Sequence, residues 1–334
     1  MIRVGVIGYG YWGPNIVRNF DSLPSCEVVR VCDKSSKALA KAAEAVPNIE
    51  TTSSPDDIFR ATDIDAVAVV TPVSTHFELS KRALENGKHV FVEKPFTATG
   101  AEAEELVDIS QRKNLKIMVD HTFLFTGAVR KMKELIDAGE LGNLYYYDSH
   151  RINLGLFQHD VNVIWDLAPH DLAIMDYLIP QEPEAIVATG ECHLNGFEDV
   201  AYLTIYFPDN IIAHINVNWL SPVKVRTTLV GGEKRMLVWN DLNADEKVKV
   251  YDKGVKVENG QGLYDLLVSY RSGDMWAPRL EQIEALKSET EHFVHCIETG
   301  ETPINDGEAG HRVVKMLEAA GESLKYRQRE VPVL

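Results

Sequence analysis

The stretch Arg3-Val4-Gly5-Val6-Ile7-Gly8-Tyr9-Gly10-Tyr11-Trp12-Gly13-Pro14-Asn15 decides the fold of this chain. Its apolar part, Val4 to Ile7, is typical of a buried parallel strand. The pattern Gly8-x-Gly10-x-x-Gly13 follows, and Pro14 suits the first turn of a helix, where an N–H would have no partner. A strand, a glycine turn and a helix in this order predict a dinucleotide-binding turn. Its glycines permit the tight turn, the close approach of a pyrophosphate and close packing of the helix.

An acidic residue follows at the distance that this type of turn requires. Asp33 lies 20 residues beyond Gly13, at the end of a second apolar run, Val28 to Cys32. An acid at this place accepts hydrogen bonds from the adenosine ribose hydroxyls. It should repel a 2′-phosphate, so we predict NAD rather than NADP, although Lys34 and Lys37 weaken the preference. The alternative is a glycine-rich turn that binds no ligand.

The composition bounds the class of protein. The 334 residues suffice for two domains, and 45% hydrophobic with 25% charged residues is ordinary for a soluble globular protein. The formal charge of −16 argues against nucleic acid or an acidic membrane surface as partner. Four scattered cysteines without a CxxC pair indicate reduced thiols and a cytoplasmic location. Neither metal-ligand spacing nor an apolar run of membrane-spanning length is present, so we predict no metal and no membrane.

Strand-like and helix-like segments alternate from residue 1 to about 120. Apolar runs at 65–70, 89–92 and 115–119 are separated by segments with helical spacing. This alternation predicts an α/β fold with a doubly wound parallel sheet, a Rossmann domain over residues 1–121. Ligands of such sheets bind outside the carboxyl ends of the strands, where Gly8, Asp33, Thr71 and Lys94 all fall.

The pattern changes in the second half of the chain. Residues 144–153, 201–207, 211–219, 223–230, 235–239 and 247–251 read as strands, with Asp252-Lys253-Gly254 as a hairpin turn. Helices are predicted near 129–136, from Pro169 onward, at 284–298 and at 307–326. These segments predict a mostly antiparallel sheet in a second domain of α+β type over residues 122–334.

Two motifs after strands carry chemistry. Thr71 and Pro72 form a stiff turn, and with His76 they are predicted to line the ribose and nicotinamide side of the cofactor; an ordinary capped loop is the alternative. Glu93-Lys94-Pro95 places a charged pair directly after a buried strand, and Pro95 could accommodate a cis peptide bond. Lys94 is predicted to bind a substrate hydroxyl or carbonyl and to stabilise negative charge on that oxygen. Its alternative is a surface salt bridge.

A third motif is Trp165-Asp166-Leu167-Ala168-Pro169-His170-Asp171. A histidine near its ordinary pKa can take a proton from an alcohol as hydride leaves, so His170 is predicted to be the acid–base residue. Asp166, four residues earlier, would fix its tautomer or bind the substrate. A cap at Asp166 and a structural histidine are the alternative.

At these motifs the sequence resembles the glucose–fructose oxidoreductase / inositol dehydrogenase (Gfo/Idh/MocA) family over nearly its whole length. The segments that carry the resemblance are GYGYWGPN from Gly8, TPVSTHFELSKRALENGKHVFVEKP from Thr71, DLAPHDL from Asp166 and the helical segment from Glu291 to Tyr326. The resemblance implies a Rossmann domain followed by an open-faced antiparallel sheet domain that binds substrate and pairs in homodimers or homotetramers. The alternating strands, Trp219 included, would suit such pairing.

The resemblance also implies roles for single residues. The family's lysine falls on Lys94, its acid–base histidine on His170 and its substrate-binding aspartate on Asp166. Tyr11, Trp12 and Glu93 fall in the cofactor segments. The segment 151–162 resembles members of nucleotide-sugar pathways, so Arg151, Gln158 and Asn162 are predicted to contact a sugar or diphosphate; a polar loop is the alternative.

Together these features predict an NAD-dependent oxidoreductase that acts on a secondary carbinol or ketone of a sugar, with a nucleotide-linked sugar favoured. Several alternatives stay open. They are a dehydrogenase of free sugars or polyols of the inositol type, an NAD-dependent glycosidase, a non-catalytic NAD-binding regulator, and an imine or enone reductase on the same scaffold.

Overall fold

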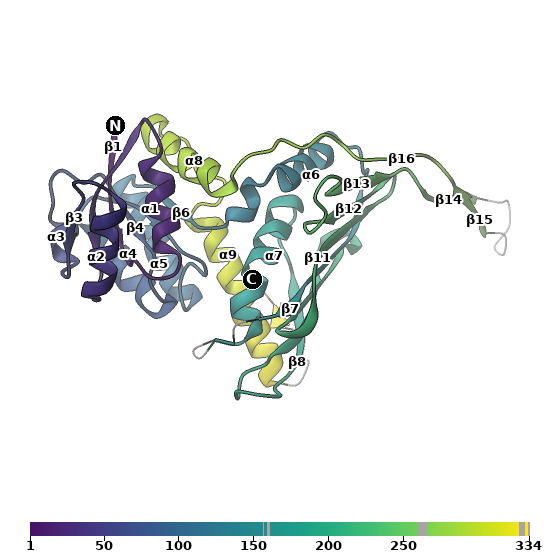
Figure 1. Cartoon of the computed structure of the whole chain (residues 1–334). Helices are drawn as coiled ribbons and strands as arrows, with labels where there is room; N and C mark the ends of the chain where they lie inside the picture. The colour runs from purple at the N-terminus through teal and green to yellow at the C-terminus, as the bar shows by residue number, and fades with distance from the viewer. Residues whose placement is uncertain (156, 159–160, 260–265, 327–330, 333–334) are drawn as a thin grey trace. The chain divides into compact units, whose positions relative to one another are not determined.

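The computed structural model describes residues 1–155, 157–158, 161–259, 266–326 and 331–332. The chain forms two compact units, coloured along the sequence in Figure 1. One consists of residues 1–125 and 283–315, and the other of residues 126–282 and 316–334. The first break lies close to the predicted boundary at 121/122. The return of residues 283–315 to the first unit was not part of the prediction.

The first unit contains the predicted parallel sheet. Its strand order is β3-β2-β1-β4-β5-β6, and every neighbouring pair is parallel. The order turns back at β1, so the sheet has a topological switch point between β1 and β4, and ligands of such sheets bind outside the carboxyl ends of the strands there. The strands are β1 (Ile2–Ile7), β2 (Cys26–Cys32), β3 (Glu50–Thr52), β4 (Ala66–Val69), β5 (His89–Val92) and β6 (Ile117–Val119).

Helices connect these strands, and side-chain caps fix the starts of two of them. Thr99 and Glu102 form a reciprocal capping box at the start of α5, and Ser35 caps α2 through the amide of Ala38. The helices are α1 (Gly13–Asp21), α2 (Ser36–Ala45), α3 (Asp56–Phe59), α4 (His76–Glu85) and α5 (Gly100–Lys113), with short 3-10 turns η1 (Val73–Thr75) and η2 (Thr122–Phe125).

An aromatic cluster explains why a late helix belongs to the first unit. Phe20 of α1, Phe91 of β5 and Phe293 of α8 (Ala285–Thr299) are fully buried, and their rings meet edge to face at centroid distances of 5.4, 6.1 and 5.7 Å. Such pairs add to the free energy gained by burial alone. The cluster therefore fixes α8 against the parallel sheet, and α9 (Gly307–Lys325) follows it.

The second unit is built on a nine-stranded sheet with the order β16-β13-β12-β11-β7-β10-β9-β8-β17. Among its described strands, β7 and β10 form the one parallel pair. The strands are β7 (Leu144–Leu154), β8 (Ala185–Glu191), β9 (Val200–Tyr206), β10 (Ile212–Asn218), β11 (Leu220–Gly232), β12 (Met236–Asn240), β13 (Val248–Tyr251), β16 (Met275–Trp276) and β17 (Val331–Pro332). A 3-10 turn, η3 (Pro208–Asn210), joins β9 to β10. The predicted combination of a Rossmann sheet and a mostly antiparallel sheet is confirmed.

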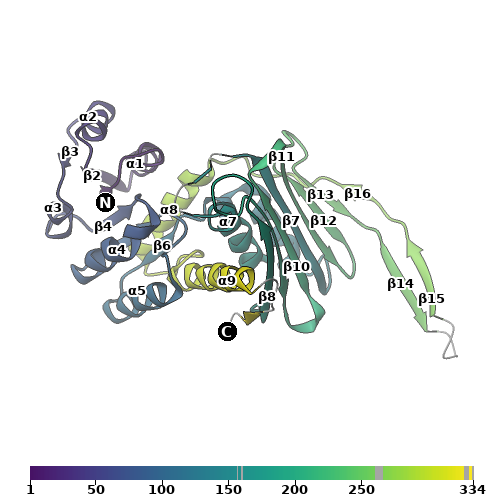
Figure 2. The same cartoon turned by 90° about the horizontal axis from the view of Figure 1, so that it is seen from below.

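The two faces of this sheet differ. Helix α7 (Val163–Leu178) and the end of α9 lie on one side of the sheet in Figure 2. Alternate residues face these helices and are buried, such as Ala201, Leu203 and Ile205 of β9. Tyr202 and Tyr206 of the same strand point to the other face and are 52% and 39% exposed. No described helix packs on that face; α6 (Gly127–Asp137) contacts α7 instead.

The predicted hairpin at Asp252-Lys253-Gly254 is wrong. Strand β13 pairs with β16, whereas β14 (Gly254–Asn259) and β15 (Leu266–Arg271) form a separate two-stranded sheet. Asp252 stands where the chain leaves the large sheet. Its amide donates to Asp274 O (2.9 Å), and its carboxylate pairs with Arg271 (2.8 Å) where the chain returns. These contacts make residues 254–271 an insertion between two paired strands.

Two further predictions are corrected. Helix α7 begins at Val163 rather than at Pro169, because the Asn162 side chain caps it by accepting from the amide of Trp165 (3.2 Å). Pro169 therefore lies inside the helix. Trp219 is fully buried, and its indole N–H donates to Asp166 Oδ2 of α7 (3.0 Å), so it does not belong to the open face. No helix in the described part of the chain is both long and apolar enough to cross a membrane.

Candidate active site

The turn between β1 and α1 has the shape that its glycines predict. Gly8 has a φ of +102°, and a Cβ atom there would lie 2.1 Å from Val70 O. A Cβ atom on Gly13 would lie 2.6 Å from Gly8 O, so the fold itself excludes side chains at both positions. Gly10 is different, because no described atom lies within 4 Å of its would-be Cβ. The open space beside Gly10 fits the predicted approach of a pyrophosphate.

Helix α1 begins beside this space without a side-chain cap. Trp12 is its N-cap residue, and Pro14 stands in its first turn. A helix N-terminus without an acidic or hydroxyl cap attracts anions through its N–H groups and its dipole. The Trp12 indole N–H donates to Asp120 Oδ2 (3.0 Å), and the Tyr11 ring, stacked on Trp12, is 93% exposed. The turn is thus anchored through Trp12, and Tyr11 stays accessible.

Asp33 lies at the end of β2 and faces the glycine turn. Its Oδ2 accepts from the amide of Tyr9 (2.7 Å), and its Oδ1 accepts from the amide of Ser35 (2.7 Å). Each oxygen keeps a second lone pair, so the carboxylate can still accept from ribose hydroxyls. Asp33, predicted to bind the cofactor, is therefore held in place by a hydrogen bond from the glycine turn.

His76 was predicted to line the ribose and nicotinamide side of the cofactor, but it lies inside the protein. Its side chain is fully buried, with Nε2 2.7 Å from Thr71 O and Nδ1 2.9 Å from Pro95 O. Burial lowers the pKa of His76, and the contacts with these carbonyls oppose the shift. The ring links the Thr71–Pro72 turn to the loop after β5. Thr71, whose hydroxyl lies 2.7 Å from that of Thr75, remains in the turn after β4.

The loop after β5 carries Lys94. The Lys94–Pro95 peptide bond is cis, as the sequence allowed, and the amide of Lys94 donates to Glu93 Oε2 (3.0 Å). Burial, and secondarily the charge of Asp120, raises the pKa of Glu93 well above its ordinary value. The Glu93 carboxyl group therefore holds the main chain of the loop that carries Lys94. Lys94 follows directly at the carboxyl end of the strand.

Helix α7 of the second unit carries Asp166 and His170. They are four residues apart inside the helix, so they lie on the same face, one turn from each other. Asp166 Oδ2 accepts from the Trp219 indole (3.0 Å), which fixes its carboxylate. His170 is partly exposed. The arrangement fits an acid–base histidine with an oriented carboxylate nearby.

The three residues predicted from the 151–162 segment are not alike. Arg151 is 3% exposed and forms an ion pair with Asp171 of α7 (2.5 Å), so its guanidinium joins β7 to α7 rather than facing a substrate as predicted. Asn162 caps α7 and donates to Glu198 Oε2 (2.9 Å), which gives its amide a structural role. Gln158 is partly exposed, and its main-chain carbonyl accepts from Asn195 (2.9 Å). Residues 156, 159 and 160 lie outside the described residues.

Sequence reasoning missed two acidic residues. Asp120 follows β6 at the same sheet edge as Lys94, and its position directly after a strand was a usable signal. Glu289 comes from α8, is fully buried, and lies within hydrogen-bonding reach of Asp120. Its distance in sequence from every strand of the parallel sheet gave no signal.

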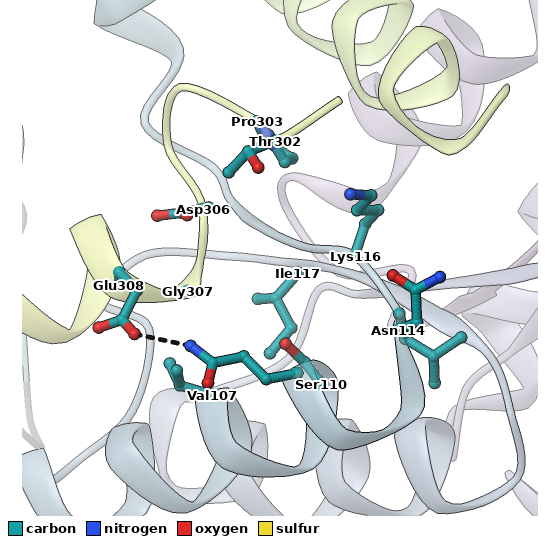
Figure 3. Close-up of a pocket in the computed structure, with 12 residues that line it drawn as sticks. Val107, Ser110, Asn114, Lys116, Ile117, Thr302, Pro303, Asp306, Gly307 and Glu308 are labelled. Carbon is teal, nitrogen blue, oxygen red and sulfur yellow. Dashed lines mark hydrogen bonds between the residues drawn. The ribbon is translucent and has the colours of Figure 1, made fainter. Parts of the chain in front are cut away.

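A pocket of about 210 Å³ lies elsewhere in the first unit. It is lined by the end of α5, the start of β6 and the loop before α9 (Figure 3). Among the lining residues, the Gln111 side-chain amide donates to Glu308 Oε1 (2.9 Å). Lys116 and Ile117 place it at the amino end of β6, away from the edge where nucleotides bind such sheets. None of the predicted site residues lines it. No group of acidic, histidine or cysteine side chains in the described residues is arranged to hold a metal ion.

Two family models match this chain. Residues 2–121 match an oxidoreductase family with an NAD-binding Rossmann fold, and residues 129–238 match the GFO/IDH/MocA C-terminal domain. The chain belongs to the Gfo/Idh/MocA family of oxidoreductases. The predicted resemblance is confirmed, and with it the class of enzyme, an NAD(P)-dependent dehydrogenase.

Relatives of this Gfo/Idh/MocA protein include two of named activity. It is 26% identical over 317 residues to a UDP-N-acetylglucosamine 3-dehydrogenase of Acidithiobacillus ferrooxidans, covering 94% of each chain. It is also 26% identical over 317 residues to a scyllo-inositol 2-dehydrogenase (NAD(+)) of Bacillus subtilis, covering 91% of this chain and 88% of the relative.

Solved structures agree with the family assignment. The structure of the Acidithiobacillus ferrooxidans enzyme aligns with a TM-score of 0.82 and 25% identity, over 97% of this chain and 98% of that chain. Levoglucosan dehydrogenase in complex with NADH aligns with a TM-score of 0.85 over 100% of this chain and 99% of that chain; at 20% identity this supports the fold alone.

Proposed function

We propose that this Gfo/Idh/MocA protein transfers a hydride between NAD and a secondary carbinol or ketone of a nucleotide-linked sugar. The observation that carries the reaction class is in the first unit. The glycine turn leads into a helix without a side-chain cap, with open space at Gly10, and Lys94 lies at the same edge of the parallel sheet. Phosphate binding and oxygen polarisation are the two functions that this edge can combine.

The proposal gives each residue a defined chemical role. When bound, NAD supplies the acceptor or donor of the hydride. The Lys94 ammonium donates a hydrogen bond to the substrate oxygen and stabilises the negative charge that develops on it. The His170 imidazole takes the hydroxyl proton during oxidation and returns it during reduction. Asp166, one turn earlier on α7, binds the substrate.

The choice of a nucleotide-linked sugar is supported by the Acidithiobacillus ferrooxidans relative, whose name states a UDP-sugar substrate. A free polyol is the second candidate, because the Bacillus subtilis relative is an inositol dehydrogenase of equal identity. Purified protein is incubated with NAD and a panel of UDP-sugars, free sugars and inositols, and NADH absorbance is recorded. Turnover confined to inositols would establish the second candidate. Sugar release without net NADH would indicate the glycosidase.

Cofactor choice is tested at Asp33. The carboxylate is fixed by two amides at the end of β2, where it can accept from ribose hydroxyls and repel a 2′-phosphate. The Asp33→Ala variant should narrow the ratio of kcat/KM for NAD over NADP about tenfold or more, which corresponds to losing one charge-assisted hydrogen bond. Asp63→Ala, at an exposed surface carboxylate, is the control. An unchanged ratio in Asp33→Ala would remove Asp33 from the cofactor site.

We also place the protein in the cytoplasm as a homo-oligomer. Cys26, Cys32 and Cys296 are buried thiols, and Cys192 is an exposed one, which suits a reducing compartment. The uncovered face of the large sheet carries tyrosines on β9, which suits pairing with a second copy.

A further inference from the structure

Three carboxyl groups meet beside Lys94. Glu93 follows β5, Asp120 follows β6, and Glu289 comes from α8. Asp120 is 3% exposed and Glu289 is fully buried. Asp120 lies within hydrogen-bonding reach of both glutamates. We call these three residues the acid cluster.

Asp120 is the acceptor at the centre of the acid cluster. Its Oδ2 accepts from the Trp12 indole (3.0 Å), and its Oδ1 accepts from the Thr122 hydroxyl. Both oxygens of Asp120 therefore act as hydrogen-bond acceptors. A carboxylate offers about four lone-pair sites, so two remain for further donors.

The glutamates have the opposite pattern. Glu289 Oε1 accepts from the Asn305 amide (2.9 Å), whereas its buried Oε2 receives no hydrogen bond from any described residue. Glu93 Oε2 accepts from the amide of Lys94 (3.0 Å). In each glutamate one oxygen accepts a hydrogen bond as a carbonyl oxygen does. The other oxygen can therefore carry a proton and donate a hydrogen bond to Asp120.

The local charges require such sharing. Three ionised carboxylates against the single ammonium of Lys94 would leave two uncompensated negative charges in a buried place. His121 does not compensate them, because burial lowers its pKa to about 4 and it is neutral. Burial, and then the charge of Asp120, raises the pKa of both glutamates well above the ordinary value.

We propose that Glu93 and Glu289 are carboxylic acids that donate to an ionised Asp120, and that this acid cluster is a positioning device for Trp12 and Lys94. Asp120 holds the cofactor turn through Trp12, and Glu93 holds the lysine loop through the amide of Lys94. The cluster thereby joins the two parts of the parallel-sheet edge. The relevance of the acid cluster to catalysis rests on the proposed function of Lys94. The protonation of Glu93 and Glu289 does not depend on that function.

Infrared spectroscopy tests the protonation without any substrate. Wild-type protein at pH 7 should show carbonyl stretching absorption of protonated carboxyl groups, and Glu289→Gln and Glu93→Gln should each remove part of it. The control is Glu291→Gln, at an exposed position of the same helix, which should remove none. Absence of the band in wild-type protein would overturn the proposal, even if every variant failed to fold.

NADH binding tests the positioning role. A glutamine can donate and accept as the protonated glutamic acid does, so Glu289→Gln should keep the Kd for NADH. Asp120→Asn should raise that Kd about tenfold or more, because the hydrogen bond from Trp12 loses its charged acceptor and the acids lose theirs. Equal Kd values for Asp120→Asn and wild-type protein would exclude the positioning of Trp12. These readouts remain valid if no sugar is turned over.

The pH dependence of unfolding gives an independent readout. A raised pKa in the folded state means that the folded protein binds more protons than the unfolded chain above about pH 4.5, so stability falls as pH rises toward the folded pKa. His121 acts oppositely, but only below its unfolded pKa of about 6.5. The difference in Tm between the Glu93→Gln/Glu289→Gln variant and wild-type protein should therefore move in favour of the variant above pH 6.5. A constant difference would refute the shared protons.

Discussion

At the scale of single residues, Lys94 is the position on which the proposed reaction depends most. It follows a buried strand, and its own amide is fixed by Glu93. The Lys94→Met variant keeps an unbranched side chain, one heavy atom shorter, that cannot donate to the substrate oxygen. We expect kcat/KM to fall about 10²–10³-fold, with the Kd for NADH close to that of the wild type.

The matched control for Lys94 is Lys81→Met on α4. Lys81 forms a surface ion pair with Glu105 (2.7 Å), and such pairs contribute little to stability. Its activity should equal that of the wild type. Steady-state kinetics together with NADH titration measure both effects, and full activity in Lys94→Met would sink the assigned role.

The positions of Gly8 and Asp33 in the fold could be predicted from the sequence because they follow from the backbone. Gly8 and Asp33 stand at fixed distances in a strand–turn–helix unit, so their positions are set by local geometry. Arg151 and Asn162 were predicted to contact substrate because the segment 151–162 resembles family members of nucleotide-sugar pathways. Their partners, Asp171 and Glu198, depend on how a strand and a helix pack, which spacing along the chain does not reveal.

At the scale of elements, the turn between β1 and α1 separates a folding role from a binding role. Gly10→Ala adds a methyl group where the protein has no atom within 4 Å, so stability should stay within about 0.5 kcal/mol. The same methyl group occupies the space of the pyrophosphate, so the Kd for NADH should rise. Gly8→Ala, with a φ of +102° and a clash at Val70 O, should lose about 1–3 kcal/mol or fail to fold.

Denaturant unfolding and NADH titration of both glycine variants distinguish the two roles. Unchanged NADH binding by Gly10→Ala would mean that the cofactor does not approach this glycine. A fully stable Gly8→Ala protein would contradict the turn geometry.

The contact between β7 and α7 gives an element-scale prediction that substrate binding does not affect. Arg151 and Asp171 are buried at 3% and 2% exposure, and Asp171 also accepts from the Ser149 hydroxyl (2.7 Å). Arg151→Met leaves a buried carboxylate without its cation and should cost about 3–5 kcal/mol. Adding Asp171→Leu should recover part of that loss. Denaturant unfolding of both variants and of Asp171→Leu alone completes the cycle, and strict additivity of the single effects would contradict the pair.

Elements with a regular hydrophobic period were predicted well, and those set by distant pairing were not. The alternation of β9 and β10 indicated their buried faces directly. The start of α7 was misplaced because Pro169 is a common first-turn residue, whereas here the cap at Asn162 decides the start. The hairpin at 252–254 was wrong because β13 pairs with a strand beyond the 254–271 insertion.

At the scale of the whole molecule, we expect the open face of the nine-stranded sheet to form the contact between copies of the chain. Helix α7 covers one face of the sheet. Side chains alternate along β9, and Tyr202 and Tyr206 lie on the other face. Exposed tyrosines on an uncovered sheet face suit a surface that pairs with a second copy. A charged side chain at either position would lose its water when two copies of the chain pair through this face. That loss costs more free energy than a contact at the edge of the interface supplies.

We therefore expect wild-type protein to be a dimer or tetramer and the Tyr202→Asp/Tyr206→Asp variant to have the mass of a single chain in light scattering. The control is Tyr326→Asp, because Tyr326 is 61% exposed and directly follows α9, whose end lies on the helix side of the sheet (Figure 2). It adds a charge away from the open face, so this variant should stay oligomeric. If Tyr326→Asp dissociated and the β9 variant did not, the interface would lie on the helix side, and the tyrosines of β9 would need another partner.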